Sequence, residues 1–399
     1  MASPIAEVAI AKRDATSREA REKLVVLVLT QVDWLLWGGV VALVTFGLWA
    51  LAGITRYDIT GDPTYYLRHQ ELYTAVGVAG AVAAIVLGPE FVRRRWRELY
   101  ALLVAGLLLI LVTGRSVNGA TRWISIGSFQ FQPSEFGKPI LAIVVAGFLA
   151  SRGRRLREPR STLDVLALAS IPIVLVFLQP DLGTALVYGA LLAGVVFIAG
   201  TSWKQIVALI ATLVALSVAV IWVIPDLTGH AILKPYQKAR LVHFWAPSRD
   251  ASGPTYNVQQ SKIAVASGGV RGRGESGATQ TRFKFVPAHQ TDFAFAAFAE
   301  QHGFAGAAAL MLIYLLVIWR GLRVVTLAQD AFSAMLVAGV LCMLLFQIAI
   351  NVGMTMQIAP VTGIPLPFVS YGGSATIANL GALGLLLAVQ IRVGRRRRA

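Results

Sequence analysis

The chain has 399 residues, of which 56% are hydrophobic, and a mean hydropathy of +0.67. A soluble domain of this length is not so apolar, so the composition favours an integral membrane protein. The net charge of +16 comes from basic residues at the ends of apolar runs, a pattern typical of membrane topology rather than nucleic-acid binding. The single cysteine, Cys342, excludes an intrachain disulfide.

Residues 1–31 are charged and lack a cleavable signal pattern, so we expect a cytoplasmic N-terminal tail. A membrane-spanning helix needs about twenty apolar residues. The rest of the chain therefore predicts an all-α, polytopic membrane protein of about ten helices, with a membrane domain over 32–393 and a basic tail over 394–399. The ten apolar runs lie at about 33–54, 70–89, 98–114, 134–151, 163–179, 183–200, 205–225, 292–319, 331–351 and 368–391.

An even number of helices places both termini on one side of the membrane. The short connections on that side are all basic, so the positive-inside rule makes this side cytoplasmic. The large segment 226–291 then faces outward. With Asp292 it holds nine Lys/Arg against four Asp/Glu, which suits an anionic lipid or a lipid-linked phosphate. A surface that merely touches acidic headgroups explains the same composition.

Several outward segments have residue patterns that differ from those of solvent-exposed loops. Residues 119–136 alternate bulky apolar and polar residues, which we interpret as an interfacial segment. Residues 258–270 are apolar enough for a short helix in the headgroup layer. Prolines interrupt the backbone between 360 and 367, and broken backbone at membrane depth must line a cavity or be buried in protein. Together these segments predict a partly covered cleft that opens outward.

A lone carboxylate, Asp292, lies where the polar segment meets the next apolar run. An ionisable group at this depth costs free energy, so it is a candidate functional residue. The competing interpretation is a helix N-cap, a position that aspartate favours.

Two further acidic residues lie near predicted helix ends. Glu135 and Lys138 are three residues apart and share one helix face, so they can pair, orient a phosphate or position Asp292. The alternative is a helix start capped by Ser134, with Pro139 in the first turns. Asp181 follows a proline and precedes Gly183, which turn and capping chemistry explains.

Four basic residues are candidates for contacting a pyrophosphate or lipid headgroup, because cations neutralise phosphate and Arg forms bidentate pairs with it. Each can instead be an interfacial anchor. Trp123 is a candidate for stacking on a sugar or for packing at the interface. The four basic candidates are Arg122, Lys238, Lys262 and Arg271.

Four long motifs, in order, resemble the RodA/FtsW/SpoVE family (shape, elongation, division and sporulation proteins). The resemblance spans roughly residues 30–393, and the segment 233–240 is closest to the RodA branch. The motifs are Asn118–Trp123 with Phe131–Glu135 and Lys138; Gln179–Thr184; Tyr256–Lys262 with Ser267–Gly269 and Pro287…Phe293; and Asn351–Met354 with Pro360–Ser374.

The resemblance implies a peptidoglycan glycosyltransferase that polymerises lipid II at the outer face of the bacterial cytoplasmic membrane, in cell-wall elongation and shape control. It implies a class B penicillin-binding protein, a transpeptidase, as partner. It places the essential acid at Asp292, as general base on the acceptor 4-hydroxyl, with undecaprenyl pyrophosphate as leaving group. Ser370, in the last motif, is predicted to contact substrate. The sequence requires no cofactor, and a loosely bound divalent cation remains open.

This chain departs from the family pattern at Gln290, where a histidine is usual; a histidine lies one position earlier, at His289. Two other functions fit the helices and intramembrane charge: a flippase or transporter of lipid-linked precursors, and a non-catalytic scaffold for the transpeptidase. No inverted repeat supports the transporter.

Overall fold

The computed structural model describes residues 32–396, except 114, 118–119, 128, 154–157, 206, 209–210 and 212–253. The N-terminal tail, most of the run at 205–225, Lys238 and residues 397–399 lie outside the described residues. The elements are α2 (Trp34–Ile54), α3 (Tyr65–Arg94), α4 (Trp96–Thr113), β1 (Arg115–Val117), β2 (Ala120–Ile126), β3 (Phe129–Phe131), α5 (Pro133–Ser151), α6 (Pro159–Leu178), α7 (Leu182–Ile198), α11 (Pro254–Gly268), α12 (Gly274–Gly277), α13 (Thr279–Arg282), α14 (Ala294–Leu327), α15 (Ala331–Thr355) and α16 (Gly373–Arg396).

Nine of the ten predicted runs correspond to helices in the described part of the chain. Seven of these helices are long and apolar enough to cross a membrane, and α7, with 17 residues, is a shorter apolar helix. The predicted polytopic helical architecture is therefore confirmed, although the count of ten is not. The short helix expected at 258–270 is present as α11.

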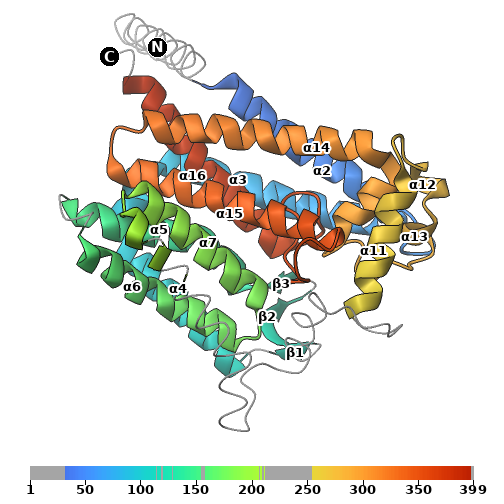
Figure 1. Cartoon of the computed structure of the whole chain (residues 1–399), viewed down its shortest axis with the longest axis horizontal. Helices are drawn as coiled ribbons and strands as arrows, with labels where there is room; N and C mark the ends of the chain where they lie inside the picture. Colours follow the sequence, from blue (N-terminus) through green and yellow to red (C-terminus); the bar gives the residue numbers. More distant parts are fainter. Residues whose placement is uncertain are drawn as a thin grey trace, which may run out of the picture.

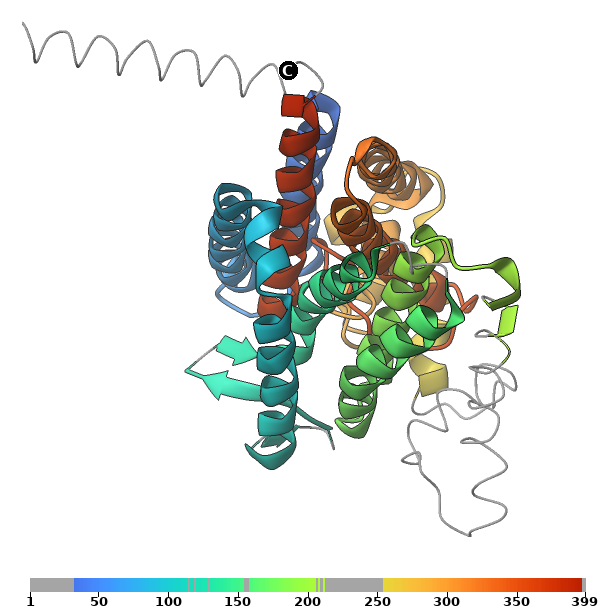
Figure 2. The same ribbon diagram turned by 90° about the vertical axis from the view of Figure 1, so that its left-hand side faces the viewer.

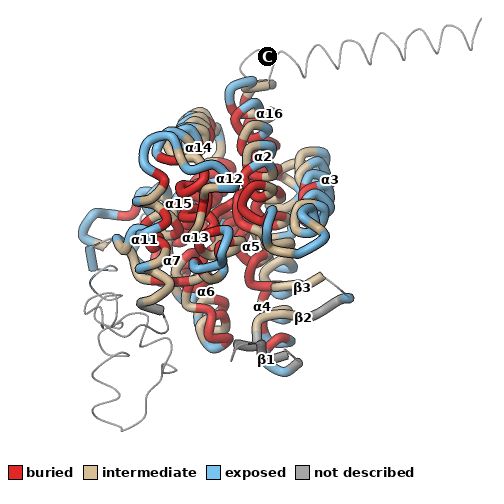
Figure 3. Tube along the Cα trace, turned by 90° about the vertical axis from the view of Figure 1, so that its right-hand side faces the viewer, coloured by how far each residue is buried: buried red, intermediate tan, exposed pale blue. Residues whose placement is uncertain are grey.

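The interior of the bundle is built by α5, α15 and α16. The share of buried residues in their apolar spans is 72%, 67% and 83%, against 11% for α3. Figure 3 shows the buried residues gathered where these central helices meet, while α3 and α14 turn exposed faces outward. Helix α16 packs against α3, α14 against α2, and α15 against α7. Polar groups on the central helices therefore lie where neither lipid nor bulk water reaches them.

The described ends of the chain lie at one end of the bundle, which we call the terminal end, as an even number of crossings predicts (Figure 1). The opposite end, which we call the loop end, comprises the described residues of 55–64, 115–132, 254–293 and 356–372. It carries the strands and α11–α13, and Figure 2 shows the strands projecting there, away from the C-terminus.

A small antiparallel sheet, β1-β2-β3, lies at the loop end, so the described chain is not purely helical. Strand β2 pairs with β3 through Ile124↔Phe131 and Ile126↔Phe129. The alternation that we interpreted as an interfacial segment has the two-residue period of a strand, which places successive side chains on opposite faces. The sheet leads directly into α5 at Pro133, with Gln132 at the N-cap position, so the alternative interpretation of Ser134 as the N-cap does not hold.

Helix α14 is broken at Gly303, which has a φ of 64°. At the break, Phe304 N–H donates to the Gly269 carbonyl at 2.8 Å and Ala305 N–H to the Val270 carbonyl at 3.0 Å. Glycine is required there, because a Cβ would lie 2.3 Å from the Gly272 nitrogen and φ is positive. The loop after α11 thus supplies the hydrogen bonds that the helix lacks at its break.

Candidate functional site

Asp292 lies at the loop end, half-buried, two residues before the first residue of α14. The N-cap position belongs to Phe293 and has no side-chain capping hydrogen bond, so the N-cap interpretation of Asp292 does not hold. The backbone around Asp292 is held from two other segments of the chain. Asn351 donates to the Asp292 carbonyl at 2.9 Å, Ser370 Oγ donates to the Thr291 carbonyl at 2.5 Å, and Tyr371 N–H donates to the Gln290 carbonyl at 2.8 Å. The carboxylate thus extends from a backbone fixed on both sides.

The proline-rich connection between α15 and α16 is what holds Asp292 in place. Most of residues 361–370 are buried, and Tyr314 donates from α14 to the Pro367 carbonyl. Ser370 is 3% exposed, and its hydroxyl also accepts from Leu366 N–H at 2.9 Å. The broken backbone here is therefore buried in protein, one of the two arrangements that membrane depth permits. Ser370, predicted to contact substrate, supports the Asp292 segment in this conformation.

Burial raises the pKa of the Tyr371 phenol, with a further contribution from its hydrogen bond with Tyr73. Tyr371 therefore stays protonated beside the Asp292 segment at physiological pH.

Glu135 and Lys138 form a buried ion pair on α5. Their side chains are 5% and 1% exposed, and Lys138 Nζ lies 2.6 Å from Glu135 Oε2. Lys138 also donates to Gln347 Oε1 on α15 at 3.3 Å. One turn further along α15, Asn351 binds the Asp292 carbonyl, and residues four apart share a helix face. One face of α15 thus connects the ion pair to the backbone of Asp292.

Asp181 caps α7, since its Oδ1 accepts from Thr184 N–H at 3.2 Å, which confirms the capping interpretation. Its Oδ2 accepts from Gln132 Nε2 at 3.0 Å, and Arg122 Nη1 lies 3.5 Å from Oδ1. Trp123 donates to Gln132 Oε1 at 3.1 Å. This polar network joins the sheet to the start of α7, beside the Glu135 helix.

The predicted phosphate-binding cations that the structure describes lie on different elements. Arg122 is 16% exposed at its side chain, donates to the Pro180 carbonyl and leaves its Nε buried without a partner. Lys262 is exposed on α11 and donates to Gln357 Oε1 at 3.0 Å. Arg271 is exposed in the loop after α11. Lys238 lies outside the described residues.

Sequence reasoning assigned no role to two residues that organise the site, Gln347 and Asn351. Both are fully buried amides in the otherwise apolar helix α15. The sequence did carry a signal for them: two amide side chains lie one helical turn apart inside a hydrophobic run. A buried amide needs a hydrogen-bond partner, so such a pair indicates a polar contact inside the bundle.

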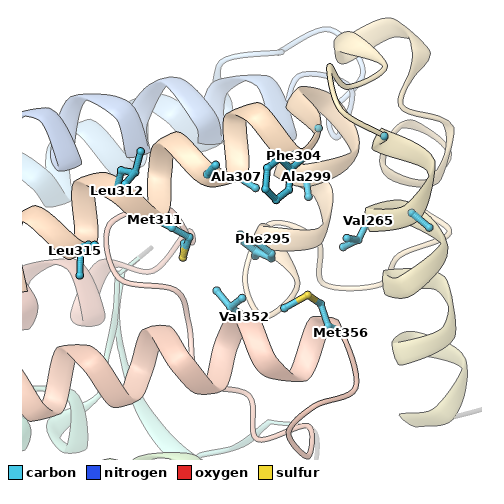
Figure 4. Close-up of a pocket in the computed structure, with 14 residues that line it drawn as sticks. Val265, Phe295, Ala299, Phe304, Ala307, Met311, Leu312, Leu315, Val352 and Met356 are labelled. Carbon is cyan, nitrogen blue, oxygen red and sulfur yellow. The ribbon is translucent and has the colours of Figure 1, made fainter.

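An apolar cavity of about 670 Å³ lies between α11, α14 and α15. Figure 4 shows Val265, Phe295, Met311, Val352 and Met356 around it. Phe295 follows Asp292 by three residues. The cavity is lined by apolar side chains, in part from the helix that follows Asp292, which suits a hydrocarbon chain.

The chain belongs to the family of cell cycle proteins FtsW, RodA and SpoVE, whose model matches residues 30–394. It is 35% identical to peptidoglycan glycosyltransferase MrdB of Escherichia coli K12, over 87% of this chain and 91% of that protein. It is 32% identical to stage V sporulation protein E of Bacillus subtilis, over 82% of this chain and 87% of that protein.

Solved structures agree with this assignment. The fold matches a chain of a peptidoglycan synthase complex described as coordinating polymerization and crosslinking, with a TM-score of 0.76 and 30% identity over 90% of this chain and 98% of that one. It also matches the rod shape determining protein RodA of Thermus thermophilus, with a TM-score of 0.64 and 29% identity over 90% and 96%. The protein is thus a multi-pass membrane protein of this family.

Proposed function

We propose that this protein is a peptidoglycan glycosyltransferase that polymerises lipid II into glycan strands. Its similarity to MrdB over most of both chains supports this activity. The observation that carries the proposal is Asp292, which extends from a backbone held by Asn351, Ser370 and Tyr371 beside an apolar cavity. A carboxylate on a fixed backbone, followed by a helix that lines an apolar cavity, suits a substrate that carries both a sugar and a lipid.

In the proposed reaction, the 4-hydroxyl of the acceptor GlcNAc attacks the anomeric carbon of a MurNAc that carries undecaprenyl pyrophosphate. The hydroxyl loses its proton to Asp292 as the new C–O bond forms, and the bond to the pyrophosphate breaks. A base held at hydrogen-bond distance contributes typically about 10²–10⁴-fold to such a step. A fixed backbone at Asp292 keeps the carboxylate in the orientation this transfer needs.

The leaving pyrophosphate needs positive charge. We propose Arg122, Lys262 and Arg271 as groups that contact it, because they are basic residues of the loop-end segments. We add Lys238 from the sequence alone, because it is a basic residue of the segment 226–291. Lys138 is committed to Glu135 at 2.6 Å, so we assign this pair to supporting the site through α15. We propose no tightly held cofactor; a divalent cation bridging the pyrophosphate would be brought by the substrate.

We propose that the protein lies in the bacterial cytoplasmic membrane, with both termini in the cytoplasm and Asp292 facing outward. The basic connections at the terminal end support this orientation. We further propose a class B penicillin-binding protein as partner, in cell-wall elongation and shape control. Support comes from the similar chain in a complex described as coordinating polymerization and crosslinking.

The test is strand formation from labelled lipid II by the purified protein with its transpeptidase partner, and by its Asp292→Asn variant. Asp62→Asn is the matched control, because it makes the same chemical change at another half-buried loop-end carboxylate, one that is paired with Arg68. Polymer lost only in Asp292→Asn supports the proposal. Full activity in Asp292→Asn would remove Asp292 as base. No polymer from the unmodified protein would favour a flippase or a scaffold.

A further inference from the structure

A second acidic residue at the loop end, Asp58, forms a buried pair with His289, three residues before Asp292. His289 Nε2 lies 2.7 Å from Asp58 Oδ1, and the two side chains are 5% and 7% exposed. The residues are 231 positions apart in the sequence, so this contact ties the connection after α2 to the segment that enters α14.

Both ring nitrogens of His289 face oxygen atoms. Nδ1 lies 3.1 Å from the Val286 carbonyl, which can only accept a hydrogen bond, so Nδ1 carries a proton. Nε2 faces a carboxylate, and a hydrogen bond there requires one more proton, on Nε2 or on Asp58. Asp58 Oδ2 is buried without a partner, so Asp58 depends on His289 for its side-chain contact. Two charged or titratable neighbours among the described residues are Lys284, which donates to the Asp58 carbonyl at 2.8 Å, and Tyr66, on which the Asp58 charge acts.

The pair acts on the backbone around Asp292 through the residue next to His289. Ala288 has a φ of 52°, which a non-glycine residue adopts only when its surroundings hold it. Its carbonyl accepts from the N–H groups of Thr291 at 3.0 Å and Phe293 at 3.2 Å. These two amides flank Asp292. Fixing the ring of His289 therefore fixes the turn from which the Asp292 carboxylate extends.

We propose that Asp58 and His289 are positioning residues for glycosyl transfer: their buried pair orients Asp292 toward the acceptor hydroxyl. The proposal rests on the proposed function. The pair does not touch the sugar, so its loss lowers kcat while leaving the affinity for lipid II nearly unchanged. A displaced carboxylate is enough for a large effect, because a misplacement of about 1 Å can cost roughly 100-fold in rate.

Five variants separate positioning from general stabilisation. Asp58→Ala, His289→Ala and the double variant remove the pair. Asp58→Asn keeps a hydrogen bond, because its amide donates to the unprotonated Nε2 of a neutral His289. Asp62→Ala is the matched control from the same connection, since its carboxylate binds Arg68 and Thr64, both of which lie outside the Asp292 segment.

Each protein is reconstituted in nanodiscs with the partner transpeptidase and assayed on labelled lipid II. We expect kcat to fall roughly 10-fold or more in the three variants that lack the pair, with KM within about two-fold. The double variant should lose no more than the worse single variant, since the two residues act as a unit. Asp58→Asn and Asp62→Ala should keep at least about half of kcat.

Hydrogen exchange of the peptide 286–293 gives an independent readout. It should be faster in the three variants without the pair and unchanged in Asp58→Asn and Asp62→Ala. Wild-type kcat in Asp58→Ala, a loss in Asp58→Asn as large as in Asp58→Ala, or unchanged exchange in all variants would overturn the proposal. An unmodified protein that makes no polymer would instead contradict the proposed function, and the exchange measurement would still decide whether the pair holds the turn.

Discussion

The side-chain amide of Asn351 donates a hydrogen bond of 2.9 Å to the backbone carbonyl of Asp292, across 59 residues of sequence. Its second N–H donates to the Ile364 carbonyl at 2.8 Å. One fully buried side chain thus joins α15, the Asp292 segment and the proline-rich connection.

Replacing Asn351 should therefore lower activity, although its side chain takes no part in the reaction itself. Asn351→Leu leaves two buried carbonyls without their donor, at a cost of about 1–3 kcal/mol for each unsatisfied group. We expect a lower kcat in lipid II polymerisation and a lower melting temperature. Gln390→Leu, which changes a buried amide on α16 near the terminal end, is the control for stability alone. Unchanged kcat in Asn351→Leu would show that Asp292 does not need this support.

Variants of the Glu135–Lys138 pair should distinguish its effect on stability from its effect on activity. Lys138→Met leaves the 5%-exposed Glu135 without its cation, and breaking a buried pair in this way costs about 3–5 kcal/mol. Adding Glu135→Gln removes the buried charge, so the double variant should regain thermal stability. It should not regain polymerisation if the pair supports the site through Gln347. Recovery of both properties would assign the pair to stability only.

The break in α14 should tolerate no side chain. Gly303→Ala places a Cβ 2.3 Å from the Gly272 nitrogen, at a φ of 64°. We expect a strong loss of folded protein by size-exclusion chromatography. Gly38→Ala is the matched control in α2, where an added Cβ meets nothing within 4 Å. There alanine should be neutral or stabilise by up to about 1 kcal/mol, because it favours helix more than glycine does. Normal yield of Gly303→Ala would contradict the described loop insertion.

Glu300 should anchor the segment between α12 and α14. Its fully buried carboxylate accepts from the N–H groups of Gln280 and Thr281, both at 2.8 Å, and from the Thr281 hydroxyl at 2.7 Å. Glu300→Gln replaces one acceptor oxygen with a donor, so we expect faster proteolysis near residues 279–282. Glu98→Gln, at an exposed position of α4, should leave the cleavage rate unchanged. Equal protection of both variants would refute the anchoring role.

Much of the fold could be predicted because membrane helices are long and apolar throughout. The limits of α2 and α5 and the start of α15 follow from where the apolar runs start and stop, whereas α15 continues four residues past its predicted end at 351. The sheet could not be recognised with equal ease, because a short strand at a membrane surface and an interfacial segment share the same alternation. The start of α14 was misplaced by two residues, since its N-cap position is held by Phe293 without a capping side chain.

The candidate site was only partly predictable for a different reason. The charges at Asp292, Glu135 and Lys138 are conspicuous in apolar surroundings, and the family motifs contain them. Their supports act across long sequence separations, as with Asn351 and the Asp292 carbonyl, and pairing of this kind depends on the tertiary fold. The buried partner of His289, Asp58, is likewise visible only once the loop end has been folded.

The most direct test is the initial rate of lipid II polymerisation by Asp292→Asn in nanodiscs, measured beside the unmodified protein at equal folded concentration. If Asp292 is the general base, the rate falls by about 10²–10⁴-fold while the melting temperature stays close to that of the unmodified protein. A rate within about two-fold of the unmodified protein would contradict the account, because a carboxamide cannot accept the proton of the acceptor hydroxyl.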